Sequence, residues 1–164
     1  MQKITPHLWF DKEAKEAAGF YASLFPDSKV TNITALHDTP SGDCDVVSFV
    51  LSGQPFMAIS AGPLFKFTPA VSFLVACSAK EEVDALWGEL SAGGMALMPL
   101  GAYPFSEKYG WVQDRYGLSW QIVPTVMDEM LKDRDEKKIA RVTEAFLQMK
   151  KFDIAALKRA YEGG

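Results

Sequence analysis

The chain has 164 residues, of which 48% are hydrophobic and 23% charged, and its formal net charge is -4. This is the composition of an ordinary folded protein, and the mild acidity without a basic stripe argues against a nucleic-acid-binding surface. The first residues, MQKITPHLWFDKE, lack the apolar stretch of a signal peptide, and no run approaches the roughly 20 apolar residues of a membrane span, so we expect a soluble cytoplasmic protein.

Residues 1–66 read as a strand, a helix and three more strands. Ile4–Phe10 alternates between two kinds of side chain, which is the period of a strand. From Glu13 onward the apolar residues recur at the spacing of an amphipathic helix, which Pro26 ends. Three strand-like runs separated by polar loops follow, and they are Lys29–Leu36, Asp45–Leu51 and Pro55–Ser60.

Residues 67–124 repeat this order of elements. Val71–Val75 is a predicted strand, and Ser78 with Glu81 has the spacing of a capping box that begins a helix. Two glycines, Gly93 and Gly94, end that helix. The remaining predicted strands are Ala96–Leu100, Ser106–Gln113 and Leu118–Val123. The sequence therefore predicts one βαβββ unit written twice.

Residues 125–164 have a different, helical character. Thr125 and Asp128 have the spacing of another capping box, Asp153 is a predicted N-cap, and 126–162 reads as helix. The charged run KDRDEKK is interpreted as a solvated link or a first turn. Two apolar stripes run along the helices: Ile139, Val142, Phe146 and Met149, then Ile154, Leu157 and Tyr161. We expect the first stripe to pack on the chain's own module or on a dimer mate, and the alternative is that it forms a docking face for a partner.

Nucleophilic catalysis finds no support in the sequence. Cys44 and Cys77 are isolated, and we expect two buried or half-buried thiols and no disulfide. Neither has a basic motif nearby to lower its pKa, and there is no Gly-x-Ser-x-Gly segment or convincing Ser/His/Asp set.

The doubled βαβββ order and the closing stretch DRYGLSWQIV resemble the vicinal oxygen chelate superfamily, the glyoxalase/bleomycin-resistance/dioxygenase group. That superfamily's second module ends in Asp-x-x-Gly-x-x-x-Glu, and here Asp114, Gly117 and Gln121 stand in those places. More closely, TPHLWFD, EAAGFYASLFPDS and YGWVQDRYGLSWQIVP look like the subfamily labelled 3-demethylubiquinone-9 3-methyltransferase. The resemblance implies an α+β homodimer. Each chain has two βαβββ modules, 1–66 and 67–124, forming a curved, mostly antiparallel sheet cleft. The C-terminal helical tail is 125–164.

The methyltransferase label conflicts with the sequence. Enzymes of the common S-adenosylmethionine type need a glycine-rich turn between a first parallel strand and a helix, where the backbone approaches the cofactor. Here SAGGM follows a helix, and LSGQP lies between two hairpin strands. We therefore expect an activity other than methyl transfer.

The resemblance also implies four metal-ligand positions, on the first and last strands of each module. Strand alternation assigns them to His7, to Met57 or Ala58, to Ser72 or Ala70, and to Gln121. A divalent ion needs three or four His or anionic oxygen ligands, so we expect no metal cofactor, with His7 and Gln121 as the available weak ligands. The other histidine, His37, is expected at the surface.

The expected ligand-binding cleft consists of His7, Trp9, Met57, Ser72, Leu74, Glu107 and Gln121. Gln121 either has its amide satisfied by backbone or water, or it orients a small ligand through a hydrogen bond. Glu107 is either solvated or the nearest carboxylate able to act as a base. Trp120 is expected in the core, and the pattern leaves open which way Tyr109 and Trp111 face. Phe105 is a further candidate for an apolar lining.

Two functions are consistent with these residues. The favoured one is metal-free binding of a small apolar or aromatic molecule, for sequestration or sensing, by a protein with no nucleic-acid or membrane partner. The alternative is a divalent-metal lyase, isomerase or dioxygenase with His7 and Gln121 in the metal shell.

Overall fold

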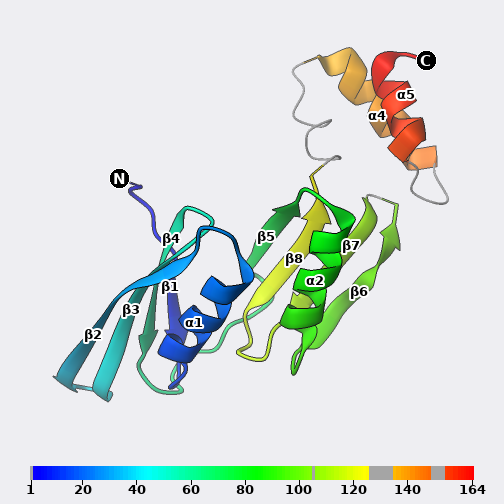
Figure 1. The fold of residues 1–164 in the computed structure, drawn as a ribbon. Helices are drawn as coiled ribbons and strands as arrows, with labels where there is room; N and C mark the ends of the chain where they lie inside the picture. The colour runs from blue at the N-terminus through cyan, green and yellow to red at the C-terminus, as the bar shows by residue number, and fades with distance from the viewer. Residues whose placement is uncertain (1, 105, 126–134, 149–153) are drawn as a thin grey trace. The chain divides into compact units, whose positions relative to one another are not determined.

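The computed structural model describes residues 2–104, 106–125, 135–148 and 154–164 (Figure 1). The chain divides into two compact units, Met1–Thr68 and Pro69–Gly164, and each is described by itself. Over the described ranges, every helix is too short or too polar to cross a membrane.

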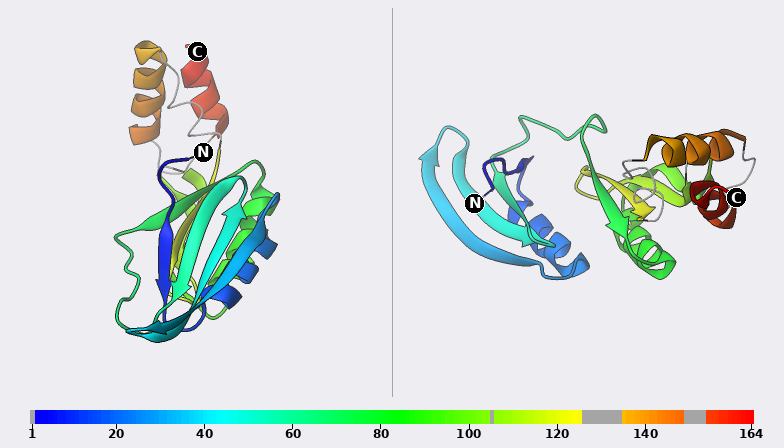
Figure 2. Two further views of the ribbon diagram at one scale, coloured as in Figure 1. Left: turned by 90° about the vertical axis from the view of Figure 1, so that its left-hand side faces the viewer. Right: turned by 90° about the horizontal axis from the view of Figure 1, so that it is seen from above.

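The first unit is a four-stranded sheet with one helix on one of its faces (Figures 1 and 2). Its elements are β1 (His7–Phe10), α1 (Ala14–Leu24), β2 (Lys29–Thr39), β3 (Gly42–Leu51) and β4 (Gln54–Ser60). The strand order is β1-β4-β3-β2, with β1 parallel to β4 and the other pairs antiparallel. This confirms the predicted βαβββ order.

The second unit repeats the arrangement. Its elements are β5 (Ser72–Cys77), α2 (Lys80–Ser91), β6 (Met95–Tyr103), β7 (Ser106–Gln113) and β8 (Ser119–Pro124). The strand order is β5-β8-β7-β6, again with one parallel pair, β5 with β8, at the edge. The α+β fold of two βαβββ units is therefore as the sequence predicts.

The core of each unit lies between the sheet and its helix, because alternate side chains of every strand point to that side. In the first unit the buried strand residues are Leu8, Phe10, Val47, Phe49, Phe56 and Ala58, and the buried helix residues are Ala14, Ala17, Ala18 and Tyr21. In the second unit the buried set is Val83, Leu86, Leu90, Val112, Trp120 and Ile122. The predicted core position of Trp120 is confirmed.

The first hairpin is longer than its sequence pattern predicts. Both β2 and β3 run on into the polar segment, so that a tight turn joins Thr39 and Gly42. The Thr39 hydroxyl donates to the Gly42 carbonyl at 2.5 Å, and Gly42 has a φ of +82°, which a glycine adopts without strain. Most of β2 is exposed, so no apolar alternation marks where it ends.

The sequence predicts a capping box of Ser78 with Glu81 at the start of α2, and the residue paired with Ser78 is wrong. The helix begins at Lys80 after the N-cap Ala79, which makes no side-chain cap. Ser78 donates its backbone N–H, at 2.8 Å, and its hydroxyl, at 3.2 Å, to the carboxylate of Glu82, not to Glu81. Since the helix starts later than the pattern indicates, the carboxylate within reach comes from the next residue along.

The C-terminal elements are α4 (Glu136–Gln148) and α5 (Ile154–Glu162), which pack on each other. Val142 and Leu157 are fully buried, and the Arg141 guanidinium donates to the carbonyls of Ala160 and Tyr161. Asp135 accepts from the backbone N–H groups of the first turn of α4, so part of the charged run is that first turn. Asp128, Met149 and Asp153, with the side chains of Phe146 and Ile154, lie outside the described residues.

The contact between α2 and β7 depends on the absence of a side chain at Gly110. A Cβ there would lie 2.4 Å from Trp87 Cζ3 and 2.6 Å from Cε3. We expect Gly110→Ala to lower the free energy of unfolding by about 1–3 kcal/mol through overpacking, measured by urea unfolding. Gly101→Ala is the matched control, because the nearest atom to its Cβ is 3.9 Å away. Equal stability of the two variants would contradict this packing, and Trp87→Leu should restore part of the loss.

Candidate functional site

Each sheet has a second face, which carries no helix of its own unit, and the strand registers fix its side chains. On the second sheet, Leu74, Gln121 and Trp111 lie side by side on β5, β8 and β7. We call this the second open face, and its side chains are Ser72, Leu74, Ala76, Met98, Tyr109, Trp111, Gln113, Ser119, Gln121 and Val123. Ser72, Leu74 and Gln121 share the face away from the helix, and Tyr109 and Trp111 lie on it too. That these residues line a ligand-binding cleft stays a prediction.

Gln121 lies at the centre of this face and is held at both ends of its amide. The Tyr109 hydroxyl donates to Oε1 at 2.7 Å, and Nε2 donates to Ser72 Oγ at 2.7 Å. From the sequence, backbone, water or a ligand were the expected partners of this amide, and two side chains from neighbouring strands take that place. A line of hydrogen-bonded polar side chains therefore crosses this face.

The Tyr109 hydroxyl is the hydrogen-bond donor to Gln121 Oε1. Burial raises the pKa of the Tyr109 hydroxyl above its usual value, and the neighbouring Tyr103 adds to the shift. The two rings meet edge to face with centroids 5.7 Å apart. The hydroxyl therefore stays protonated at neutral pH, and Gln121 presents its oxygen to a fixed hydrogen-bond donor.

Two further polar atoms on the second open face have no partner within the described residues. They are Trp111 Nε1 and Ser119 Oγ, both buried, and Ser119 as a whole is fully buried. A buried hydrogen-bonding group left unpaired costs about 1–3 kcal/mol, and most native proteins have few of them. Nothing in the sequence pattern marks these atoms, because an unpaired group is a property of the packing around it.

The first sheet has a corresponding open face, whose side chains include His7, Trp9, Ser48, Met57 and Ile59. His7 pairs with Met57 in register, so Met57 shares its face, whereas Ala58 is buried under the helix. This decides between the two residues that the sequence left open. His7 is exposed. Trp9 donates its Nε1–H to the Gly62 carbonyl at 2.8 Å.

Glu107, the carboxylate of the predicted cleft, and His37, the second histidine, each have a side-chain partner. Glu107 Oε1 lies 3.0 Å from Lys80 Nζ, and the Glu107 side chain is 15% exposed. His37 is exposed, as expected, and its Nδ1 lies 3.0 Å from Asp43 Oδ2. Phe105 lies outside the described residues. Glu107 is thus neither freely solvated nor unpaired.

Asp114 and Gly117 build the turn that sets the register of β8. The Asp114 carboxylate accepts from the backbone N–H groups of Tyr116 and Leu118, and Gly117 has a φ of +88°. Its other oxygen accepts from Trp120 Nε1 at 2.8 Å, beneath the helix. The first position of the Asp-x-x-Gly stretch therefore has a structural role, and the sequence pattern does not indicate its bond to Trp120. This bond fixes Trp120 inward and thereby Gln121 outward.

The residues at the implied metal positions do not fit a divalent ion. They are an imidazole, a thioether, a hydroxyl and a neutral amide, from His7, Met57, Ser72 and Gln121. The Gln121 amide already uses both of its ends inside the protein. Within the part of the chain that the structure describes, no three His, Cys, Asp or Glu side chains converge. Such a donor set lacks the anionic oxygens and imidazoles that hold these metals.

The thiols do not form a nucleophilic site either. Cys44 and Cys77 are free and buried, as expected. Burial raises the pKa of Cys77 to about 12, and the nearby Glu82 carboxylate adds to the shift. A thiol that stays protonated is a poor nucleophile.

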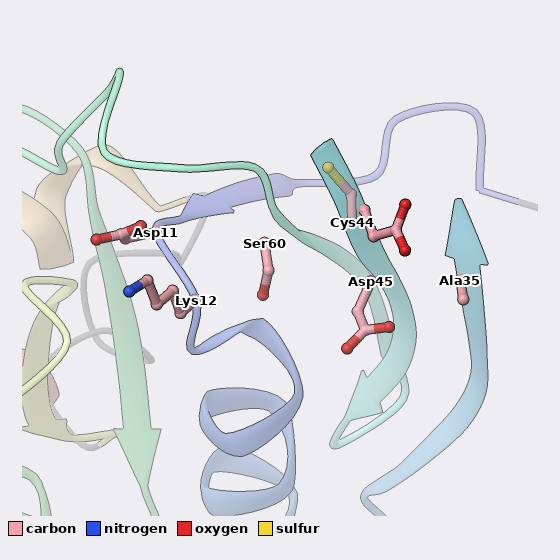
Figure 3. Close-up of a pocket in the computed structure, with 7 residues that line it drawn as sticks. Asp11, Lys12, Ala35, Cys44, Asp45 and Ser60 are labelled. Atoms are coloured by element: carbon pink, nitrogen blue, oxygen red, sulfur yellow. The ribbon is translucent and has the colours of Figure 1, made fainter. Parts of the chain in front are cut away.

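A polar pocket in the first unit was not predicted from the sequence (Figure 3). It has a volume of about 260 Å³ and is lined by Asp11, Lys12, Ala35, Asp43, Cys44, Asp45 and Ser60. It lies at the start of α1, where Ser60 Oγ accepts from the Ala14 N–H at 3.0 Å. Ser60 therefore helps to begin the helix, and the pocket contains none of the predicted cleft residues.

Comparison with known proteins places the chain in a family. The model of the 3-demethylubiquinone-9 3-methyltransferase family matches residues 2–123. The structure of a putative 3-demethylubiquinone-9 3-methyltransferase, PhnB protein, from Bacillus cereus is 42% identical, with a TM-score of 0.70 over 75% of this chain and 99% of that one. No curated protein matches the chain.

More distant structures share the fold. A glyoxylase/bleomycin resistance protein/dioxygenase domain from Frankia is 16% identical, with a TM-score of 0.50 over 76% of this chain and 98% of that one. The fosfomycin resistance protein FosX from Listeria monocytogenes is 14% identical, with a TM-score of 0.51 over 75% and 94%. With a family match over most of its length, the chain belongs to the 3-demethylubiquinone-9 3-methyltransferase family, and it shares its fold of two βαβββ units with the glyoxylase/bleomycin resistance protein/dioxygenase domain.

Proposed function

We propose that this protein binds a small, mainly apolar or aromatic molecule on its second open face, without a catalytic divalent metal. The observation that carries this proposal is the state of Gln121. Its neutral amide is hydrogen-bonded at the oxygen to Tyr109 and at the nitrogen to Ser72. These two bonds fix the amide in the protein surface, and coordination of a metal ion would have to break the bond at the oxygen.

The lining of the second open face supports this proposal. Small-molecule sites are mostly apolar and aromatic, with a few polar groups that fix orientation. Here Trp111 supplies a half-buried ring, and Leu74 is 59% exposed, whereas the buried Tyr109 contributes its hydrogen bond to Gln121. The ten side chains that define this face include no Lys, Arg, Asp or Glu, and the nearby Glu107, two residues before Tyr109 on β7, is paired with Lys80. A neutral, partly aromatic surface favours an uncharged ligand of the same character.

The strand ends argue against methyl transfer of the common cofactor-dependent kind. That chemistry uses a glycine-rich turn from a parallel strand into a helix, so that the backbone approaches the cofactor. Here β1 is followed by Asp11, Lys12 and Glu13, and β5 by Ser78 and Ala79. Neither segment contains a glycine, so neither is a turn of that kind, and the family name therefore does not describe the proposed activity.

The alternative is a metal-dependent enzyme of the same superfamily. One FosX structure, of a mutant protein 13% identical to this chain, is described as complexed with Mn(II) and a dihydroxypropylphosphonic acid. That identity shows a shared fold alone. Both the small-molecule ligand and the homodimer expected from the family resemblance stay predictions for this chain.

A metal titration separates the two functions. Protein stripped with EDTA and given Ni, Zn, Co, Mn, Fe or Mg ions should unfold thermally at the same temperature, because the donors do not fit. A real site at an ion concentration ~100-fold above its dissociation constant would add about 2.7 kcal/mol. That corresponds to several degrees, at about 2–4 °C per kcal/mol for a chain of this size. A shift lost in both His7→Ala and Gln121→Ala would replace our proposal with the metalloenzyme.

The Tyr109–Gln121 bond can be tested through its pH dependence. Tyr109→Phe should lower the free energy of unfolding by about 1 kcal/mol at pH 7, measured with urea, because Gln121 Oε1 loses its donor. The folded pKa of Tyr109 is raised above 10.0, so its contribution is fully present below pH 10 and is lost as pH rises further. The difference between Tyr109→Phe and the native protein should therefore shrink above pH 10.

Tyr103→Phe is the control for this measurement, since its hydroxyl donates to the Pro99 carbonyl at an exposed site. It should change stability less than Tyr109→Phe. A pH-independent difference for Tyr109→Phe would show that lost packing, not the hydrogen bond, is responsible.

A further inference from the structure

The second open face contains two buried polar atoms without partners, and they lie close together in the sheet. Trp111 is opposite Gln121 in the β7–β8 register, and Ser119 is opposite Gln113, one step along the same face. Trp111 Nε1 and Ser119 Oγ are the buried side-chain atoms without a partner among the described residues. Elsewhere on this face the Gln121, Tyr109 and Gln113 side chains all make hydrogen bonds.

The chemistry of these two atoms defines what could pair with them. An indole N–H can only donate a hydrogen bond, whereas a serine hydroxyl can donate or accept. The complementary group is therefore an acceptor oxygen. No side chain that defines this face carries a positive charge, and a buried anion without a counter-charge is strongly disfavoured. The acceptor must then be an uncharged oxygen, such as a carbonyl.

We propose that Trp111 Nε1 and Ser119 Oγ recognise an uncharged carbonyl oxygen on an aromatic molecule bound to the second open face. This inference rests on the proposed function, because it names the ligand class for the same face. The ring of the ligand packs on Trp111 and Leu74, and its carbonyl accepts the indole N–H. Ligands of the class are bicyclic aromatic ketones and similar neutral carbonyl compounds.

Binding requires a neighbouring side chain to move, because both atoms are covered. Met98 lies opposite Trp111 on β6 and shares its face. Methionine is unbranched and adapts its shape readily, so Met98 is the side chain that we expect to turn away. Opening breaks no hydrogen bond from Trp111 Nε1 or Ser119 Oγ to another described residue, since neither atom has a partner among those residues.

The state of the free protein can be tested first. Trp120 donates its Nε1–H to Asp114, whereas Trp111 Nε1 has no partner in the described chain. Trp120→Phe should therefore lower the urea midpoint, and Trp111→Phe should leave it unchanged or raise it. A loss in Trp111→Phe as large as that in Trp120→Phe would overturn the inference, since the indole N–H would then have a partner.

The ligand class is tested with 1-tetralone and tetralin, which share a bicyclic body and differ in one carbonyl. Binding is followed by ¹H–¹⁵N spectra of the four tryptophan indoles, with Trp111 assigned from Trp111→Phe. We expect 1-tetralone to bind about tenfold more tightly than tetralin, and to move the Trp111 indole proton downfield. In Trp111→Phe and in Ser119→Ala the preference for the ketone should fall toward one. Trp111→Phe should also weaken tetralin binding, because the smaller ring offers less packing surface, whereas Ser119→Ala keeps the indole and should leave tetralin binding unchanged.

The outcomes separate this inference from the function beneath it. Equal binding of both probes, with the Trp111 indole proton unmoved, would overturn the carbonyl recognition and leave the apolar binding function standing. Binding of neither probe to the native protein would overturn both. If Trp111→Phe does not fold, Ser119→Ala carries the comparison alone, because it removes one hydroxyl and no ring.

Discussion

The structure depends on the two-residue alternation of its strands. Each sheet packs one face against a helix, so the strands beneath the helix must present apolar side chains at every other position, whereas the exposed arm β2 does not. The bond from Trp120 to Asp114 anchors this alternation in β8, because it holds the indole under α2 at the start of the strand. Gln121 must then lie on the opposite face. A slip of one residue would exchange the two and bury the amide in the core.

The order of helices and strands could be predicted because the spacing of apolar residues differs between the two. Helical spacing and strand alternation indicated both βαβββ units, and β7 was predicted with its observed bounds of Ser106–Gln113. The ends of β2 and β3 were missed because a hairpin arm exposed on both sides needs no apolar pattern. The partner of Ser78 was missed because Glu81 and Glu82 are adjacent, and only the helix start decides which carboxylate reaches back.

For the candidate site, the sequence predicts which face of the sheet each side chain lies on, but not which hydrogen bonds the side chains make. Alternation is enough to place Ser72, Leu74 and Gln121 on one face. It cannot show that Gln121 reaches diagonally across two strands to Ser72 and Tyr109, because this depends on side-chain rotamers. Likewise, Glu107 has the sequence context of a solvated carboxylate, and its pairing with Lys80 arises only when α2 and β7 come together.

The parallel pairing at the edge of each sheet has a consequence for how the chain folds. Antiparallel neighbours such as β2 and β3 are joined by short turns and can pair as soon as both exist. In contrast, β1 pairs with β4, and the whole of α1, β2 and β3 lies between them. During synthesis β1 leaves the ribosome before β4, its partner in the sheet. Until β4 has been made, β1 stays unpaired and its apolar side chains Leu8 and Phe10 stay exposed. Closing such long loops is entropically costly, so we expect docking of β1 and β5 to be the late step in folding.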